Sequence, residues 1–308
     1  MLALTFPGQG SQRPGMGSAW TGSPSWSLVD RASEVAGRDV AALLLDADAE
    51  ELRATRNAQL TTFVASLVAL DALRRAGLPE PDAVAGHSLG EYTALTAAGA
   101  LAVEDGVRLV AARGEAMQAA ADARPGTMAA VLGLDVAEVE AACAAVADEA
   151  WVANDNAPGQ VVVAGTPAGV EAAGAAAKER GARKVLPLPV GGAFHTPLMA
   201  PAAEGLGAAL ADAAFSDPRP PVVANVDATP HGGAGDWPAL LADQLCRPVR
   251  WRPTLEHLGH VDGEGPVTLV EVGPGGVLTG MAKRTLPGAR ALTVSEPDHV
   301  EAVLAALR

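Results

Sequence analysis

Residues 83–91 read AVAGHSLGE and predict a buried strand, a sharp turn and the first turn of a helix. The strand is the apolar run Ala83-Val84-Ala85, which stops at Gly86. Good helix formers, rich in Ala, follow from Glu91. A strand, a tight turn and a helix form the repeating unit of a mostly parallel sheet with helices on both faces. This segment therefore predicts the α/β class.

The same pattern extends from this segment in both directions along the chain. Residues 2–6 (LALTF) are an apolar run that stops at Pro7-Gly8, as is typical of a buried strand before a turn. Further strands are expected at residues 222–226 and 268–272, with a polar, Gly-rich loop at 229–235. Helical patterns cover residues 27–75, most clearly 60–73, and residues 103–121.

The pattern changes near Arg124-Pro125-Gly126. The segments that follow predict, in order, a strand, a helix, two strands, a helix and a strand, at residues 128–132, 136–147, 151–163, 170–181 and 184–190. A βαββαβ order resembles a ferredoxin-like unit. We therefore expect a large α/β-hydrolase-like domain, residues 1–124 and 192–308, with a mostly parallel sheet. A small inserted ferredoxin-like α+β domain is expected at residues 125–191.

Composition and charge restrict the class of protein. The hydrophobic fraction of 49% and charged fraction of 19% indicate an ordinary globular chain. The net charge of −14 repels phosphate backbones, so no nucleic-acid partner is expected. The start of the chain does not resemble a signal peptide, and the apolar segment 60–70 is too short for a membrane span. Cys143 and Cys246 have no metal-site spacing; one disulfide would be feasible, but reduced thiols in the cytoplasm are the simpler expectation.

Ser88 is the strongest candidate nucleophile. It is the central residue of Gly86-His87-Ser88-Leu89-Gly90, a GxSxG pattern between the predicted strand and helix. In so sharp a turn, glycines are needed on both sides of the serine because side chains there would clash. The hydroxyl is then exposed at a helix amino terminus, and the amide of Leu89 can donate to a developing oxyanion. The alternative is a chance Gly-rich turn.

A nucleophilic serine needs a general base, and the chain has six histidines. His87 is adjacent to Ser88, and its side chain is expected to point away. His231 lies in the Gly-rich loop, where we expect it to be solvated. His195 follows a predicted strand in the apolar, turn-rich segment 191–197, from which it could reach a cleft. Spacing alone leaves His195 open between a base and a structural histidine.

The chain as a whole resembles the malonyl-CoA:acyl-carrier-protein transacylases, which include the acyltransferase domains of polyketide synthases. The resemblance rests on ordered motifs along nearly the whole sequence: FPGQGSQ at 6–12, GHSLGEY at 86–92, RLVAARG at 108–114 followed by Met117-Gln118, MAAV at 128–131, NDNAPGQ at 154–160, GAFHTPLM at 192–199, PVRW at 248–251 and EVGPGG at 271–276.

The resemblance implies a role for each catalytic residue. Ser88 would be the nucleophile and His195 its base, and the main-chain carbonyl of Gln244 would orient the imidazole. The oxyanion hole would consist of the amides of Gln9 and Leu89.

The resemblance also implies two substrate-binding residues. Arg113 would bind the malonyl carboxylate through two parallel hydrogen bonds; from composition alone it would be a surface helix residue. Phe194 matches the phenylalanine of malonyl-selective relatives, whose ring crowds an α-methyl group. Many relatives have Ser or His where this chain has Gly191-Gly192, which leaves the shape of the pocket floor open.

The implied activity is malonyl transfer from malonyl-CoA to the phosphopantetheine thiol of an acyl carrier protein, by a ping-pong reaction through a malonyl-serine ester. No metal or redox cofactor is expected, and the protein would be a monomer. Basic pairs that could dock an acidic carrier are Arg74-Arg75, Arg183-Lys184 and Lys283-Arg284. The resemblance does not separate fatty-acid from polyketide synthesis.

Three alternatives remain open from the sequence. One is a serine α/β-hydrolase or thioesterase, with Asp262 as the acid and His299 as the base. Hydrolases commonly place an HGG-type oxyanion motif before the nucleophilic serine, whereas His231-Gly232-Gly233 follows Ser88 in this chain. Another is a trans-acting polyketide acyltransferase that uses a different extender unit. The third is a non-catalytic carrier-docking module, which the presence of both Ser88 and His195 disfavours.

Overall fold

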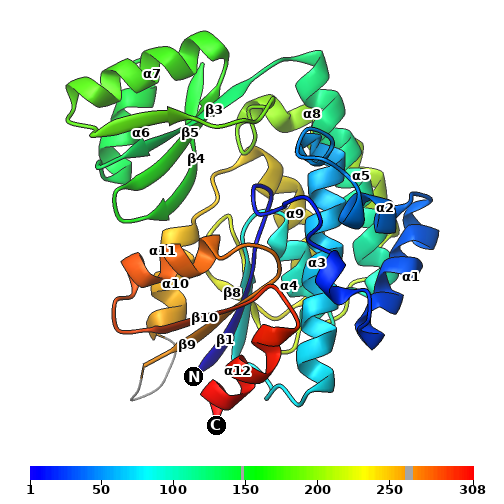
Figure 1. Ribbon diagram of the computed structural model, residues 1–308. Coiled ribbons are helices and arrows are strands. Elements are labelled where there is room, and N and C mark those ends of the chain that lie inside the picture. Colours follow the sequence, from blue (N-terminus) through cyan, green and yellow to red (C-terminus); the bar gives the residue numbers. More distant parts are fainter. Residues whose placement is uncertain (147–148, 261–265) are drawn as a thin grey trace.

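The computed structural model describes residues 1–146, 149–260 and 266–308, and shows a mixed α/β protein with two sheets (Figure 1). In the larger sheet the strand order is β10-β9-β1-β2-β7-β8. All neighbouring strands pair in parallel except β7 and β8. These strands are β1 (Leu2–Phe6), β2 (Ala83–Gly86), β7 (Val222–Val223), β8 (Pro230–His231), β9 (Thr268–Val272) and β10 (Arg290–Val294). The expected mostly parallel sheet is confirmed.

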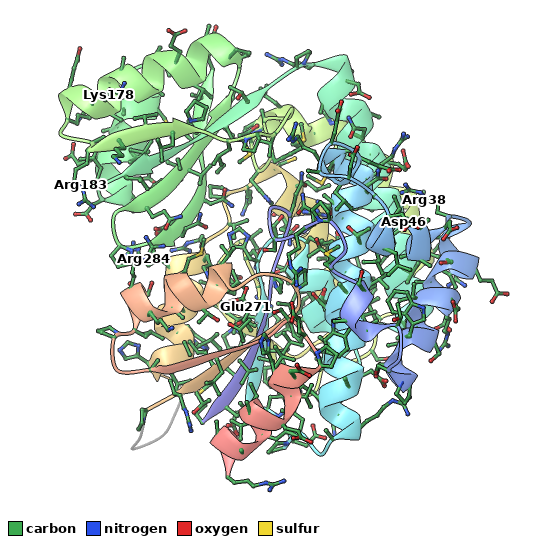
Figure 2. All side chains as sticks on the ribbon, viewed as in Figure 1. Arg38, Asp46, Lys178, Arg183, Glu271 and Arg284 are labelled. Atoms are coloured by element: carbon green, nitrogen blue, oxygen red, sulfur yellow. The ribbon has the colours of Figure 1, made fainter. Side chains whose placement is uncertain are left out.

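Helices cover both faces of this sheet because successive strand residues point to opposite sides. Leu2, Leu4 and Phe6 of β1 join one apolar core, and Ala3 joins the other. The first core is shared with α1 (Ser27–Ala36), α3 (Thr55–Arg75), α4 (Gly90–Ala97), α5 (Val103–Ala123), α8 (Ala200–Asp212), α9 (Trp237–Cys246) and α12 (Asp298–Leu307). The second is shared with α10 (Trp251–His260) and α11 (Val277–Thr285). Side chains fill the space between sheet and helices (Figure 2).

The smaller sheet is antiparallel, with the strand order β4-β5-β3-β6. Its elements are β3 (Thr127–Leu132), α6 (Val136–Ala144), β4 (Ala150–Ala157), β5 (Gln160–Gly165), α7 (Pro167–Glu179) and β6 (Lys184–Pro187). The helices α6 and α7 share an apolar core with the sheet. Asn154 of β4 also pairs with Val249, so this sheet is joined to the segment before α10. The expected end of the first helix, Ala147, lies outside the described residues.

Several expected boundaries were wrong. The helical pattern expected over 27–75 is divided into three α-helices and a 3-10 helix at Glu51–Arg53. Gly37 ends α1 in the left-handed region (φ 60°), and Asp39 caps α2 (Val40–Leu45). The strand expected at 222–226 has only two residues, and the loop expected at 229–235 contributes β8. The edge strand β10 was not expected. No helix in the described ranges is both long and apolar enough to cross a membrane.

Candidate active site

The turn between β2 and α4 needs both of its glycines, as predicted. A Cβ on Gly86 would lie 1.9 Å from the carbonyl carbon of Gly90, and a Cβ on Gly90 would lie 2.0 Å from the carbonyl oxygen of Phe6. Ser88 between them is in the left-handed region, with φ 52°. Such strain at a non-glycine residue is typical of a functional turn. The main-chain amide of Ser88 donates to Oδ1 of Asn225 at 2.7 Å, which helps to hold this conformation.

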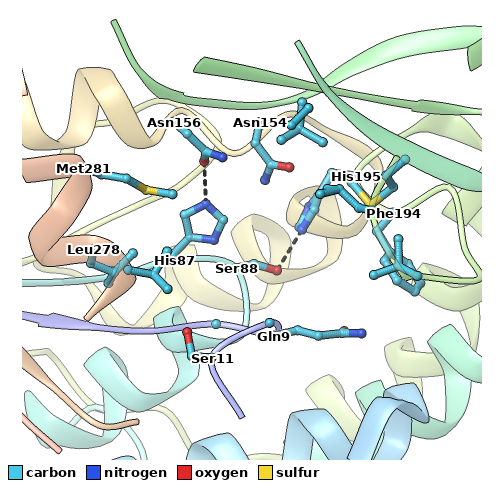
Figure 3. Close-up of a pocket in the computed structure, with 18 of the residues that line it drawn as sticks. Gln9, Ser11, His87, Ser88, Asn154, Asn156, Phe194, His195, Leu278 and Met281 are labelled. Carbon is cyan, nitrogen blue, oxygen red and sulfur yellow. Dashed lines mark hydrogen bonds between the residues drawn. The ribbon is translucent and has the colours of Figure 1, made fainter. Parts of the chain in front are cut away.

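The structure brings Ser88, His195 and Gln244 together from distant parts of the chain. Ser88 Oγ lies 2.7 Å from His195 Nε2 (Figure 3), and His195 Nδ1 donates to the Gln244 carbonyl oxygen at 2.8 Å. That donation puts the remaining imidazole lone pair on Nε2, facing the serine hydroxyl. Burial, assisted by the charge of Arg113, lowers the pKa of His195 to about 3. The imidazole is therefore neutral near pH 7 and able to accept the serine proton.

Two other histidines are placed differently. His87 turns away from Ser88, as expected, and its Nε2 lies 2.8 Å from Asn156 Oδ1 (Figure 3). His231 was expected to be solvated, which was wrong: it is half-buried, with Nε2 3.0 Å from Asp227 Oδ2.

Two main-chain amides near Ser88 have free hydrogen-bonding capacity. These are the amides of Gln9, in the loop after β1, and of Leu89, directly before α4. Within the described ranges neither donates to a protein acceptor. Gln9 and Ser88 line the same cavity. Unpartnered amides at a helix amino terminus can stabilise an oxyanion.

Arg113 of α5 is fully buried, so a surface position for this residue is wrong. Nη2 donates to Ser88 Oγ at 3.1 Å and to Gln244 Oε1 at 2.8 Å, and Nη1 donates to Gln59 Oε1. In the described part of the chain no carboxylate lies within 4.0 Å of the guanidinium, and its Nε has no partner. A buried cation is costly unless it is paired. This one therefore suits an anionic group brought in by a ligand.

Phe194 is buried beside this site and shapes the pocket. A Cβ on Gly192 would lie 2.4 Å from the Phe194 ring. Of the Gly191-Gly192 pair, which left the shape of the pocket floor open, Gly192 therefore makes room for the ring, whereas a Cβ on Gly191 would meet nothing within 4 Å.

The cavity in front of Ser88 has a volume of about 260 Å³ and lies between the two sheets. The larger sheet and its helices contribute the loop after β1, the serine turn and α11; the smaller sheet contributes β3, β4 and β5. Its lining includes polar amides as well as apolar groups: Gln9, Asn154, Asn156, Phe194, Leu278 and Met281, which Figure 3 labels, and Gln160. Such a lining suits an elongated ligand with polar and apolar portions.

Comparison with known proteins agrees with this geometry. The family model described as an acyl transferase domain matches residues 4–304. The chain belongs to the acyl transferase family. It is 40% identical to the malonyl CoA-acyl carrier protein transacylase of Bacillus subtilis (strain 168), over 100% of this chain and 97% of that protein. The family resemblance predicted from the sequence motifs is confirmed.

Solved structures of this acyl transferase family have the same fold. The acyl-carrier-protein S-malonyltransferase of Burkholderia pseudomallei 1710b superimposes with a TM-score of 0.93 at 40% identity, covering 99% of both chains. Another, PlMCAT:AntF, is a malonyl-transacylase in complex with a type II polyketide synthase acyl-carrier protein. It has a TM-score of 0.93 at 38% identity, again over 99% of both chains.

The hydrolase alternative has no support at the site. His299 contacts Ser295 near the start of α12, whereas the imidazole that forms a hydrogen bond with Ser88 Oγ is that of His195. Asp262 lies outside the described residues. His231 belongs to the edge strand β8.

Sequence reasoning missed three buried polar residues of this acyltransferase site. Gln59 of α3 bridges Arg113 and the side chain of Gln9. Glu91 accepts hydrogen bonds from the Asn225 amide at 2.6 Å and from Gln244 Nε2 at 2.5 Å. Burial raises the pKa of Glu91 to about 8, although these donors and Arg113 oppose that rise. Two sequence features could have pointed to these residues. Gln59 is a polar residue next to an apolar stretch, and Asn225 follows the end of a short strand.

Proposed function

We propose that this protein transfers the malonyl group from malonyl-CoA to the phosphopantetheine thiol of an acyl carrier protein. The observation that carries the proposal is the buried guanidinium of Arg113, without a carboxylate partner among the described residues, 3.1 Å from Ser88 Oγ. A guanidinium can donate two parallel hydrogen bonds to a carboxylate, and this one lies beside the nucleophile. The names of the relatives at about 40% identity support the same reaction.

The first half-reaction acylates the enzyme. His195 Nε2 takes the proton of Ser88 Oγ as the oxygen attacks the thioester carbonyl. The Gln9 and Leu89 amides donate to the oxyanion, and the Gln244 carbonyl stabilises the imidazolium. As the C–S bond breaks, His195 returns the proton to the CoA thiolate, leaving malonyl-Ser88.

The second half-reaction uses the same groups in reverse. His195 takes the proton of the phosphopantetheine thiol, and the sulfur attacks the serine ester. Ser88 Oγ leaves and regains the proton from His195. The bonds and protons balance as written, so the proposed reaction calls on no metal or redox cofactor.

Phe194 sets a preference for malonyl over α-methylated extender units. Its ring lines the pocket in front of Ser88, where it would crowd an α-methyl group. One methyl group changes selectivity by about 1–3 kcal/mol, so the expected preference is moderate.

We also propose that the two sheets form two domains of different type. The strand order β4-β5-β3-β6, with α6 and α7, supports a ferredoxin-like domain at 125–191. The mostly parallel sheet with its serine turn supports a hydrolase-like domain formed by 1–124 and 192–308. We expect a cytoplasmic monomer; the free thiols of Cys143 and Cys246 support a reducing compartment.

The reaction is tested with purified protein, malonyl-CoA and a phosphopantetheinylated acyl carrier protein. We expect the carrier mass to rise by about 86 Da, the malonyl group in place of hydrogen. Acetyl-CoA should give a much slower transfer, because it has no carboxylate for Arg113. Release of free malonate without modification of the carrier would contradict the proposal and favour a hydrolase.

A further inference from the structure

A buried polar network lies beneath the serine turn and touches neither the cavity nor the reacting atoms. It consists of Glu91 in the first turn of α4, Asn225 after β7 and the side chain of Gln244 in α9. All three are at most 1% exposed. Glu91 lies between the other two: Oε1 accepts from the Asn225 main-chain amide, and Oε2 accepts from Gln244 Nε2.

Asn225 and Gln244 each hold the main chain of the serine turn. Asn225 Oδ1 accepts from the Ser88 amide at 2.7 Å, and its Nδ2 donates to the Gly86 carbonyl at 2.7 Å. Gln244 Nε2 also donates to the Ser88 carbonyl at 2.9 Å. Both main-chain polar groups of the strained Ser88 are therefore fixed by residues that depend on Glu91. A conformation with positive φ persists at a non-glycine residue only where its surroundings hold it firmly.

The orientation of the Gln244 amide is fixed by the same pattern. Its Oε1 accepts from Arg113, so its Nε2 must face Ser88 and Glu91. Both oxygens of Glu91 face N–H donors, an arrangement that suits a group able only to accept. A glutamine at position 91 would place an NH₂ group against one of these donors. Gln244 would then have to turn, which would break its contact with Arg113.

We propose that Glu91 is a positioning residue for the nucleophile: its carboxylate holds Asn225 and Gln244 in the orientations that fix Ser88 and direct the Gln244 carbonyl to His195. Glu91 acts through these two residues and does not contact the substrate. The inference deepens the proposed function, because the same serine carries the acyl group. It therefore needs a test that does not depend on which acyl group is transferred.

The test measures the reaction of Ser88 with a small phosphonofluoridate, followed by intact mass, in the full-length wild type and in Glu91→Gln. It is run at a pH well above 8, because burial raises the pKa of Glu91 to about 8 and the proposal concerns the ionised carboxylate. We expect the maximal rate constant of labelling to fall about tenfold to a hundredfold in Glu91→Gln, because a buried donor loses its charged partner. The half-saturating reagent concentration should not change, since the cavity is intact.

The matched control is Glu271→Gln. Glu271 of β9, labelled in Figure 2, is also 1% exposed. Its carboxylate accepts hydrogen bonds from the main-chain amides of Leu278 and Thr279 in α11 rather than from the serine turn. This variant should unfold at a lower temperature than the wild type, and its labelling rate should stay within about twofold of the wild-type rate. Equal losses of rate in the two variants would overturn the proposal, because the effect would then be general destabilisation. Wild-type labelling in a folded Glu91→Gln would overturn it as well.

A second variant tests the network if Glu91→Gln does not fold. Asn225→Ser keeps the main-chain amide that Glu91 accepts but removes the side-chain contacts to Ser88 and Gly86. The same loss of rate is expected, and full reactivity in this variant would contradict the proposal. If the wild type is labelled at Ser88 but transfers no malonyl group, the proposed function fails while the role of Glu91 is still tested.

Discussion

Arg113 illustrates at the scale of one residue how burial gives a common side chain a particular role. Its guanidinium donates hydrogen bonds only to neutral oxygens, those of Gln59, Ser88 and Gln244, among the described residues. Its Cζ also lies 5.4 Å from the centroid of the Tyr92 ring, but no carboxylate of the described residues lies within 4.0 Å to compensate its charge. A substrate carboxylate left without this partner would lose about 2–5 kcal/mol. We expect Arg113→Ala to lower malonyl transfer at least about a hundredfold while acetyl transfer is kept or rises. Steady-state kinetics with both CoA esters would show this; equal losses would mean that Arg113 is structural.

His195 gives a second prediction at this scale. Because burial lowers its pKa to about 3, the imidazole takes up a proton only as the pH falls toward that value. In the free enzyme the His195 imidazole should therefore stay neutral from about pH 8 down to about pH 5. An ordinary histidine would already be protonated at the lower end of this range. Nitrogen chemical shifts of ¹⁵N-histidine, assigned with His195→Gln, would measure this. Protonation of His195 between pH 7 and pH 6 would contradict it.

The residues that sequence reasoning found and missed differ in their local signal. Ser88 could be predicted because its turn requires glycines at fixed positions. His195, Gln244 and Arg113 were assigned only through motif resemblance, since their proximity depends on contacts across 107, 156 and 25 residues, respectively. Glu91 gave no periodic signal because every residue of α4 is buried. Its partner Asn225 is 134 residues away.

At the scale of the element, the β2–α4 turn can form because neither Gly86 nor Gly90 has a side chain. The main chain of Gly86 packs directly against that of Gly90, and Gly90 packs against the main chain of Phe6. A Cβ on Gly86 would overlap the main chain of Gly90, which no rotamer change can relieve. We expect Gly86→Ala to lower the free energy of unfolding by about 3 kcal/mol or more and to abolish labelling of Ser88.

The control is Gly207→Ala in α8, where an added Cβ meets nothing within 4 Å and the position is exposed. This variant should gain about 0.5–1 kcal/mol through helix propensity. Chemical denaturation would measure both variants, and a stable, active Gly86→Ala would contradict this account of the turn.

Other elements were less predictable, for physical reasons. Strand β10 lies at the edge of the sheet, where Arg290 is exposed and little alternation of apolar and polar residues is required. Strand β7 is shorter than its apolar run because Asn225 leaves the sheet to bond Glu91 and Ser88. The class of the larger sheet was predictable, since buried parallel strands are continuous apolar runs.

At the scale of the whole molecule, the proposed function requires a protein with a charge of −14 to bind a carrier that we expect to be acidic as well. Of the three basic pairs, Lys283-Arg284 lies at the end of α11, a helix that lines the cavity. Arg284, labelled in Figure 2, donates to Oε1 of Gln160 in β5. Arg75 instead pairs with Asp71 in α3.

Reversing both charges at 283 and 284 to Glu should raise the KM for the carrier about three- to tenfold and flatten its salt dependence. Acyl-enzyme formation from malonyl-CoA should be unchanged. The control carries the same reversal at Arg74-Arg75. An unchanged carrier KM at low salt would exclude this pair as the docking site, and slowed acylation would show that it binds the CoA phosphates instead.

In the proposed reaction Ser88 carries the malonyl group, and intact-mass spectrometry after mixing the protein with malonyl-CoA detects this acyl-enzyme. We expect a gain of about 86 Da, located on the peptide that contains Ser88 and lost when a phosphopantetheine thiol is added. Ser88→Ala should show no such gain. An adduct that persists in Ser88→Ala, or that lies on another peptide, would contradict the account.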